Sequence, residues 1–191
     1  MKTSKLMVYD TTLRDGAQGE GVSFSGSGKL KLALRLDQFG VDYIEGGYAG
    51  SNQKDMAFFD EIRKVKLAHA KIVAFGSTRR VKTRVKDDGF VLSMLKADTP
   101  VVTVGGKAWK LHVRDVLRTT ARENQAMIAD TVGFLKERGR EVFFDAEHFF
   151  DGYKDDPAFA MAALKSAVAA GADMLVLCDT NGGCLPHEIH T

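Results

Sequence analysis

The sequence predicts an α/β fold built on a parallel sheet. Three observations indicate this class: short apolar runs recur along the 191 residues, most of them are apolar at consecutive positions, and helical patterns lie between them. Consecutive apolar positions are typical of strands that are covered on both faces, as strands in parallel sheets are. Strand and helix alternate about six times, which predicts right-handed crossovers between neighbouring strands.

Six short runs rich in Val, Ile, Leu and Phe are expected to form the strands. In chain order they are Leu6–Asp10, Val41–Gly46, Lys71–Phe75, Val101–Gly105, Glu141–Asp145 and Met174–Asp179. Helical patterns follow the first five strands, over Lys29–Gly40, Met56–Val65, Phe90–Lys96, Thr120–Gly139 and Pro157–Gly171.

Several of these helix ends carry their own signals. Thr120 and Glu123 form a Thr-x-x-Glu capping box, and Pro157 fits a first helical turn. Gly40 fits a C-cap. Gly26–Gly28 precedes the first helix without directly following a strand, so we favour a flexible loop there over a phosphate cradle.

Polar residues at the strand ends favour a (β/α)8 TIM barrel over a doubly wound sheet. A barrel builds its active face from the carboxyl ends of several strands, whereas a doubly wound sheet concentrates its ligand contacts at one switch point. Acidic or hydroxyl residues follow nearly every strand: Asp10, Glu45, Ser77, Asp145 with Glu147, and Asp179 with Thr180. An eight-unit barrel needs at least about 200 residues. We therefore expect residues 1–191 to be the N-terminal part of a barrel domain that stops before strands 7 and 8.

Composition excludes several classes of protein. The net charge of +2 argues against a nucleic-acid-binding protein, which usually has a clustered basic face. No apolar run approaches the roughly 20 residues that cross a bilayer, and the N-terminal residues lack the apolar stretch of a signal peptide. Two cysteines, Cys178 and Cys184, do not make a disulfide scaffold, so a cytoplasmic location is expected.

The most informative motif is DTTLRDG, Asp10–Gly16, which follows the first strand. Arg14 and Asp15 are adjacent in this loop, and both can face the mouth of a barrel. An Asp carboxylate is a hard oxygen ligand suited to Mg²⁺ or Mn²⁺, and an Arg beside it can bind a carbonyl or carboxylate. The alternative is a surface ion pair between Arg14 and Asp15. Glu45 is expected to line the barrel or to hydrogen-bond Arg14 from below.

A second group of candidates follows the fifth and sixth strands. Asp145 and Glu147 are two residues apart and should point the same way, so one of them can hold a raised pKa suited to a base. Alternatively, Glu147 forms a surface pair with His148. Thr180 contacts a ligand or caps a turn with Asp179.

Two further motifs contain basic residues or histidines. For Arg79 and Arg80, two interpretations remain: they bind an anion, or they form a solvated basic turn. His187 and His190 have a spacing of three, whereas the zinc-protease motif requires a spacing of four on one helical face.

Longer stretches carry a family resemblance. DTTLRDGAQ resembles the opening signature of metal-dependent lyases and synthases related to pyruvate carboxylase and isopropylmalate synthase. The stretches GVDYIEGGYAGSNQKDMAFF, AFGSTRR, VGGKAWKLHV and LCDTNGGCLPHEI are similar to the citramalate-synthase branch of the isopropylmalate/homocitrate/citramalate synthase family. The resemblance covers essentially the whole sequence.

This resemblance implies an acyltransferase that joins acetyl-CoA to a 2-oxo acid in branched-chain amino-acid biosynthesis, with pyruvate favoured as acceptor. It implies a divalent metal ion (Mg²⁺, Mn²⁺ or Zn²⁺) with Asp15 as a ligand, and Arg14 steadying the oxygen that gains negative charge. Glu147 matches the family's proton-abstracting acidic residue, and Thr180 matches a threonine that contacts the oxo acid. Asp145 and Gln18 are further substrate-binding candidates.

Alternatives remain to the preferred activity. The first is a 2-isopropylmalate synthase that uses 2-oxoisovalerate, and the second is a lyase or aldolase of the same superfamily. The third is a non-catalytic module, because the family's His-x-His metal ligands follow a seventh strand that the sequence does not contain. The full-length protein is expected to be a homodimer that binds neither nucleic acid nor membranes.

Overall fold

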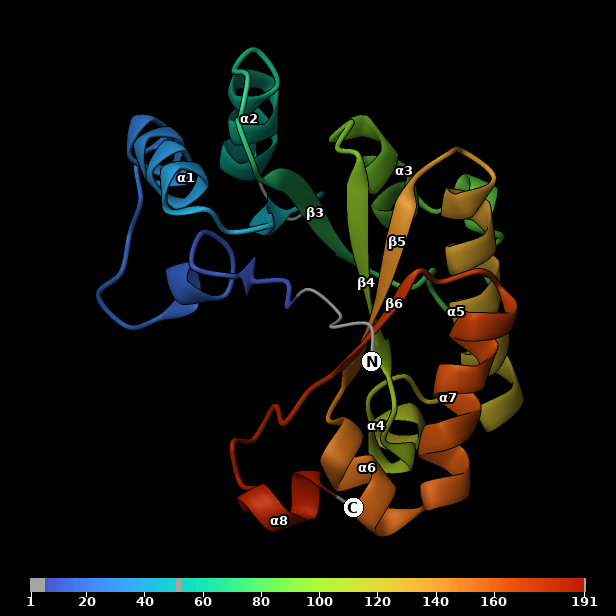
Figure 1. The fold of residues 1–191 in the computed structure, drawn as a ribbon. Helices are drawn as coiled ribbons and strands as arrows, with labels where there is room; N and C mark the ends of the chain where they lie inside the picture. The colour runs from blue at the N-terminus through green and yellow to red at the C-terminus, as the bar shows by residue number, and fades with distance from the viewer. Residues whose placement is uncertain (1–5, 51–52, 191) are drawn as a thin grey trace, which may run out of the picture. The chain divides into compact units, whose positions relative to one another are not determined.

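The computed structural model describes residues 6–50 and 53–190 (Figure 1). The chain divides into two compact units. The first runs to Gly76 and takes in Ser93–Val102, and the second holds Ser77–Leu92 together with the residues from Thr103 onward.

The order of the strands decides between the two α/β architectures. The strands occur in the sheet in chain order, β1-β2-β3-β4-β5-β6, and the pairs β1·β2, β2·β3 and β5·β6 are parallel. A doubly wound sheet reverses its strand order at a switch point, whereas barrel strands follow the chain order. The order without a reversal confirms that the fold is part of a (β/α)8 barrel.

The first unit contains three strands and two long helices. These elements are β1 (Tyr9–Asp10), α1 (Gly26–Phe39), β2 (Tyr43–Tyr48), α2 (Gln53–Ile62) and β3 (Lys71–Ser77), whose last residue belongs to the second unit. Helices α1 and α2 pack against each other and against β2. Two further elements, α3 (Gly89–Lys96) and β4 (Val101–Lys107), pass from one unit to the other.

The start of α1 corrects the prediction of a loop at Gly26–Gly28. These residues form the first turn of the helix, and the Ser25 side chain accepts a hydrogen bond from the Gly28 N–H at 3.1 Å. This bond satisfies one of the backbone donors that a helix start leaves unpaired. At the far end Gly40 has a φ of 89°, the left-handed conformation expected of a C-cap glycine.

The second unit continues the alternation to the end of the described chain. Its elements are α4 (Lys110–Asp115), α5 (Ala121–Lys136), β5 (Glu141–Glu147), α6 (Phe149–Asp155), α7 (Pro157–Ala169), β6 (Met174–Leu177) and α8 (Pro186–Ile189). Helices α5 and α7 lie side by side (Figure 1). In the described chain no helix combines the length and apolar character that a membrane span requires.

The core of the second unit fixes the direction of the side chains on β5. Ile128 and Phe144 are fully buried, and a Cβ atom added at Gly106 of β4 would meet both side chains. Phe144 therefore points toward the side of the sheet that α5 covers. Because neighbouring residues of a strand point to opposite faces, Asp145 and Glu147 share the other face, as expected.

Sequence patterns missed the shortest elements. Helices α4, α6 and α8 and the 3-10 turns Gly16–Gln18 and Val85–Asp87 are each shorter than eight residues, too short to show an apolar period. Strand β1 keeps only two of the five predicted residues, and β6 ends at Leu177. Both strands lie at the ends of the strand order, where one neighbour rather than two sets the ladder.

Candidate active site

The loop after β1 is folded tightly by its own hydrogen bonds. Asp10 accepts from the Thr12 N–H at 3.0 Å and from the Thr12 hydroxyl at 3.1 Å. The Thr11 carbonyl accepts from the N–H groups of Arg14 and Asp15 at 3.1 and 2.9 Å. The DTTLRDG motif therefore encodes a compact turn that presents Arg14 and Asp15 directly after the strand.

Arg14 is held by a buried carboxylate from the next strand. Its Nε–H donates to Glu45 of β2, a side chain that is 1% exposed, and the Tyr9 hydroxyl donates to the same carboxylate at 2.5 Å. The guanidinium lies 4.1 Å from the centre of the Phe75 ring. The expectation that Glu45 bonds Arg14 is confirmed, and the arrangement leaves the guanidinium with few alternative positions.

Asp15 is the exposed partner in this loop. Its carboxylate pairs with Arg14 at 3.1 Å, so the predicted ion pair exists, and its side chain is 61% exposed. A carboxylate of this kind fits one coordination position of a hard divalent cation. Over residues 6–50 and 53–190, no group of three or more His, Cys, Asp or Glu side chains is arranged to hold a metal ion. The described residues thus offer one ligand rather than a complete donor set.

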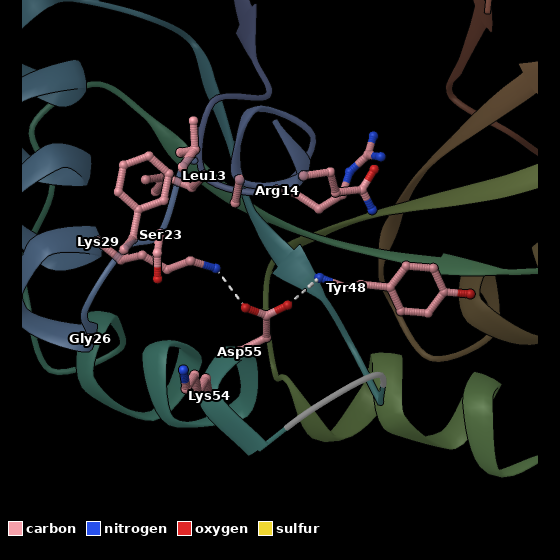
Figure 2. A pocket seen from close by; sticks show the side chains of 12 residues that line it. Leu13, Arg14, Ser23, Gly26, Lys29, Tyr48, Lys54 and Asp55 are labelled. Atoms are coloured by element: carbon pink, nitrogen blue, oxygen red, sulfur yellow. Dashed lines mark hydrogen bonds and ion pairs between the residues drawn. The ribbon is translucent and has the colours of Figure 1, made fainter. Parts of the chain in front are cut away.

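A cavity of about 230 Å³ lies beneath this loop (Figure 2). Arg14 and Gln18 line it, together with the buried ion pair between Lys29 and Asp55, whose atoms Nζ and Oδ1 are 2.6 Å apart. Asp55 also accepts the Tyr48 N–H at 3.0 Å. The structure therefore brings the candidates Arg14, Asp15 and Gln18 together in the first unit.

The second unit contains the other three candidates. On β5, the Asp145 carboxylate accepts a hydrogen bond from the Cys178 thiol at 3.1 Å. Glu147 forms an ion pair with Lys107 of β4, and each of these two side chains is 27% exposed. The alternative of a surface pair between Glu147 and His148 is wrong, because the His148 ring instead bonds Asp151 at 3.2 Å.

Thr180 is fixed by the backbone of His148. The His148 N–H donates to the Thr180 Oγ1 at 2.9 Å, and His148 has a φ of 55°, which is rare for a residue with a side chain. Since this oxygen accepts, the hydroxyl hydrogen of Thr180 is left to donate to another oxygen. The neighbouring turn is built by Asp179, which accepts the N–H groups of Gly183 and Cys184 at 3.3 and 2.9 Å.

The rings of Trp109, His112 and His148 form a cluster near the end of β5, the strand that ends at Glu147. The rings of His112 and His148 meet edge to face with centres 4.4 Å apart, and the Trp109 ring lies 4.9 Å from His112. Burial, followed by the charges of His148 and Lys107, lowers the pKa of His112 below its usual value. The lowered pKa favours the neutral form of His112.

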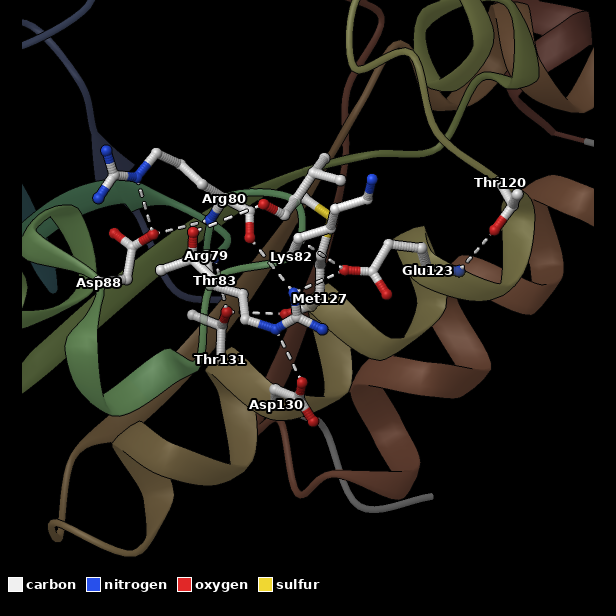
Figure 3. Close-up of polar contacts among 11 residues, drawn as sticks. Arg79, Arg80, Lys82, Thr83, Asp88, Thr120, Glu123, Met127, Asp130 and Thr131 are labelled. Atoms are coloured by element: carbon white, nitrogen blue, oxygen red, sulfur yellow. Dashed lines mark hydrogen bonds and ion pairs between the residues drawn. The ribbon is translucent and has the colours of Figure 1, made fainter.

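Arg79 has a structural role (Figure 3). It is buried, and its guanidinium donates to Asp130 at 2.7 Å and to Glu123 at 2.8 Å. Burial alone would lower the pKa of Arg79, but the hydrogen bonds that its guanidinium donates to these two carboxylates raise it. The Thr120 hydroxyl accepts a hydrogen bond from the Glu123 N–H, as in a capping box. The Glu123 carboxylate, however, pairs with Arg79.

Arg80, the next residue, has an exposed side chain. It bonds the fully buried Asp88 at 3.1 Å. The solvated basic turn is therefore wrong for Arg79, and both arginines have carboxylate partners within the chain.

Sequence reasoning missed two residues of this region, Lys107 and His148. The fourth strand was expected to end at Gly105, but it continues to Lys107. An ionisable residue two positions beyond Gly105 is the signal that could have found Lys107, because alternate residues of a strand share a face. The contact of His148 with Thr180 runs through its backbone, which no residue pattern reports.

Comparisons with known proteins identify the family of the chain. The HMGL-like family matches residues 5–191. An (R)-citramalate synthase of Aquifex aeolicus is 56% identical over 97% of this chain and 35% of its own length, and one of Sulfolobus acidocaldarius is 52% identical over 100% and 36%. A 2-isopropylmalate synthase of Staphylococcus carnosus is 32% identical over 97% of this chain.

Among solved structures, the HMG-CoA lyase of Bacillus subtilis superposes with a TM-score of 0.76 at 16% identity, covering 97% of this chain and 61% of the lyase. At this identity the likeness concerns the fold alone. The chain spans about a third of the length of the curated relatives it matches. On the family match over residues 5–191, the chain belongs to the HMGL-like family.

Proposed function

We propose that the protein containing this chain condenses acetyl-CoA with pyruvate to give (R)-citramalate and free CoA. One observation carries the choice of acceptor. Relatives named (R)-citramalate synthase are 50–56% identical to the chain, whereas homocitrate and 2-isopropylmalate synthases are 30–34% identical over a similar stretch. Such a product belongs to branched-chain amino-acid biosynthesis.

The residues around Glu147 fit the first step of this reaction. The Glu147 carboxylate takes a proton from the methyl group of acetyl-CoA, and the electron pair of the broken C–H bond forms the enolate. The enolate carbon then bonds to the keto carbon of pyruvate as the thioester carbonyl re-forms, and the C=O electron pair of pyruvate moves onto oxygen, which takes up a proton. Water subsequently cleaves the thioester and releases CoA.

The remaining candidates position the oxo acid. The Thr180 hydroxyl has its hydrogen available for an oxygen of pyruvate, since its own oxygen accepts from His148. Arg14, steadied by Glu45, supplies a cation for the keto oxygen as negative charge develops there. Asp145 and Gln18 are further candidates for contact with the substrate. A divalent metal ion, for which Asp15 offers one carboxylate ligand, would polarise the keto group when bound.

The deciding assay measures free CoA released from acetyl-CoA by the full-length protein. Release that depends on pyruvate and on Mg²⁺ or Mn²⁺, with citramalate as the product, supports the proposal. Turnover with 2-oxoisovalerate in place of pyruvate would identify a 2-isopropylmalate synthase instead. Cleavage of 3-hydroxy-3-methylglutaryl-CoA without synthase activity would identify a lyase. The predicted homodimer is tested separately, by light scattering on the same preparation.

A further inference from the structure

Lys107 and Glu147 occupy matching places at the ends of neighbouring strands. Lys107 is the last residue of β4, and Glu147 is the last residue of β5. Gly106 faces Phe144 and α5, so Lys107 points to the opposite side of the sheet, where Glu147 also lies. There the ammonium group and the Oε2 atom form an ion pair.

The backbone around Lys107 is fixed from two sides. Asn124 of α5, a buried side chain, donates to the Lys107 carbonyl at 2.9 Å. The next residue, Ala108, donates its N–H to the Glu147 carbonyl at 3.3 Å. The main chain of Lys107 is thus anchored, while four rotatable side-chain bonds leave its ammonium group able to move.

Other ionisable groups lie around this ion pair. His112 of α4 interacts electrostatically with Lys107, Glu147 and Asp151. Asp145 shares the face of β5 with Glu147 and accepts a hydrogen bond from Cys178. His148, next in the chain, bonds Asp151. Burial lowers the pKa of His112, which favours its neutral form, His148 bonds Asp151, and the two aspartates bring no positive charge. The cation that pairs with the Glu147 carboxylate is therefore Lys107.

We propose that Lys107 is a further catalytic residue, which holds the Glu147 carboxylate before the reaction and then bonds the thioester oxygen of the enolate. This proposal rests on the proposed function. As Glu147 takes the methyl proton, the C–H electron pair becomes the C=C bond of the enolate and the C=O pair moves onto the thioester oxygen. Glu147 becomes a neutral acid. Lys107 keeps its three protons, and one of its N–H groups stops donating to the Glu147 Oε2 and donates instead to the thioester oxygen.

The physical advantage lies in where the negative charge travels. It leaves one oxygen beside the ammonium group and appears on another within reach of the same group. A donor that is already placed where charge develops needs little reorganisation during the reaction, which is how such groups lower a barrier.

The test uses the full-length enzyme with Lys107→Met, Lys107→Gln and Lys107→Arg. Lys110→Met serves as the matched control, because Lys110 pairs with Asp156 at 3.2 Å and its side chain is 63% exposed. The measurements are kcat, KM for both substrates, and the isotope effect with trideuterated acetyl-CoA.

We expect kcat of Lys107→Met and Lys107→Gln to fall about 100-fold, the scale of losing one donor to a developing oxyanion. KM for pyruvate should change less than about threefold. The isotope effect should increase, Lys107→Arg should recover part of kcat, and Lys110→Met should match the wild type.

An isotope effect that stays unchanged in Lys107→Gln would overturn the proposal, whatever happens to thermal stability. Exchange of the acetyl-CoA methyl hydrogens with D₂O is followed in parallel, because it reports enolate formation alone. Wild-type exchange without condensation of pyruvate overturns the proposed acceptor but still tests Lys107 through its variants. A wild-type enzyme that shows no exchange and no condensation overturns both proposals.

Discussion

Arg14 and Glu45 form an ion pair in which a buried carboxylate from β2 fixes a guanidinium on the loop after β1. The Tyr9 hydroxyl adds a second donor to the same carboxylate. Because Glu45 has almost no contact with solvent, its charge is compensated by these groups rather than by water. The pair links a residue proposed for catalysis to the stability of the first unit.

Replacing Glu45 should therefore affect both stability and activity. We expect Glu45→Ala to lower the free energy of unfolding of the full-length protein by about 3 kcal/mol, since it leaves the arginine charge without its buried partner. Tyr9→Phe removes one hydrogen bond and should cost about 1 kcal/mol. Urea denaturation measures both variants. Equal losses for the two would contradict the assignment of the ion pair as the main contribution.

Gly47 and Gly133 should respond to alanine in opposite ways. A Cβ atom at Gly47 would lie 2.6 Å from the Asp55 Cγ, whereas at Gly133 in α5 nothing lies within 4 Å. Gly47→Ala must displace the Lys29–Asp55 pair and should lower the free energy of unfolding by about 1–3 kcal/mol. Gly133→Ala should raise it by about 0.5–1 kcal/mol, because alanine favours the helix. Chemical denaturation of both variants decides, and stabilisation by Gly47→Ala would disprove the steric argument.

Asp37 predicts a dependence of stability on acid pH. Burial raises the pKa of its carboxyl, but hydrogen bonds from the N–H groups of Ala68, His69 and Ala70, each 2.8 Å long, outweigh this effect, so the pKa is lowered below 3.8. A lowered folded-state pKa contributes stability that is fully present above the unfolded value and is lost as pH falls through the folded one.

Denaturation of the wild type and Asp37→Asn between pH 3 and 7 tests this contribution, on the pH scale set by ordinary carboxyl pKa values of about 4. The variant should be less stable at neutral pH, and the difference should shrink below pH 4. Asp60→Asn, at an exposed carboxylate, should follow the wild-type curve. A constant difference across this range would show that the ionisation of Asp37 is not responsible.

The network of Arg79 requires its forked guanidinium. Arg79→Met should lower the free energy of unfolding by about 2–3 kcal/mol, less than for a fully buried pair because Asp130 is half exposed. Arg79→Lys should recover less than half of this loss, since a single ammonium group cannot bond Glu123 and Asp130 in the same geometry. Arg114→Met, at an exposed pair, should leave stability unchanged. Full recovery by lysine would mean that charge alone matters.

These residues show how far a sequence can predict such a site. The positions of Arg14, Asp15, Glu147 and Thr180 at strand ends could be predicted from periodicity and motifs, because the alternation of strand and helix repeats over many residues. The side chains that these residues contact could not be predicted in this way. Lys107 pairs with Glu147 across 40 positions.

The same limit applies to Arg79. It pairs with Asp130 across 51 positions of the sequence, and only the packing of α5 against the segment that follows β3 determines that contact. Residue type indicated what these side chains can do, whereas the tertiary fold decides which partner each of them has.

Thr180 supplies the prediction most closely tied to substrate binding. Its Oγ1 accepts from the His148 N–H, so its hydroxyl hydrogen can donate to pyruvate. Thr180→Ser keeps this donor and should retain kcat/KM for pyruvate within about threefold, whereas Thr180→Val removes it and should lower kcat/KM by about 10- to 100-fold. Ser166→Ala, which removes a hydroxyl bonded within α7, is the control and should have no effect. If valine is tolerated as well as serine, the hydroxyl does not contact the oxo acid, and the backbone of His148 is left as the main partner of Thr180.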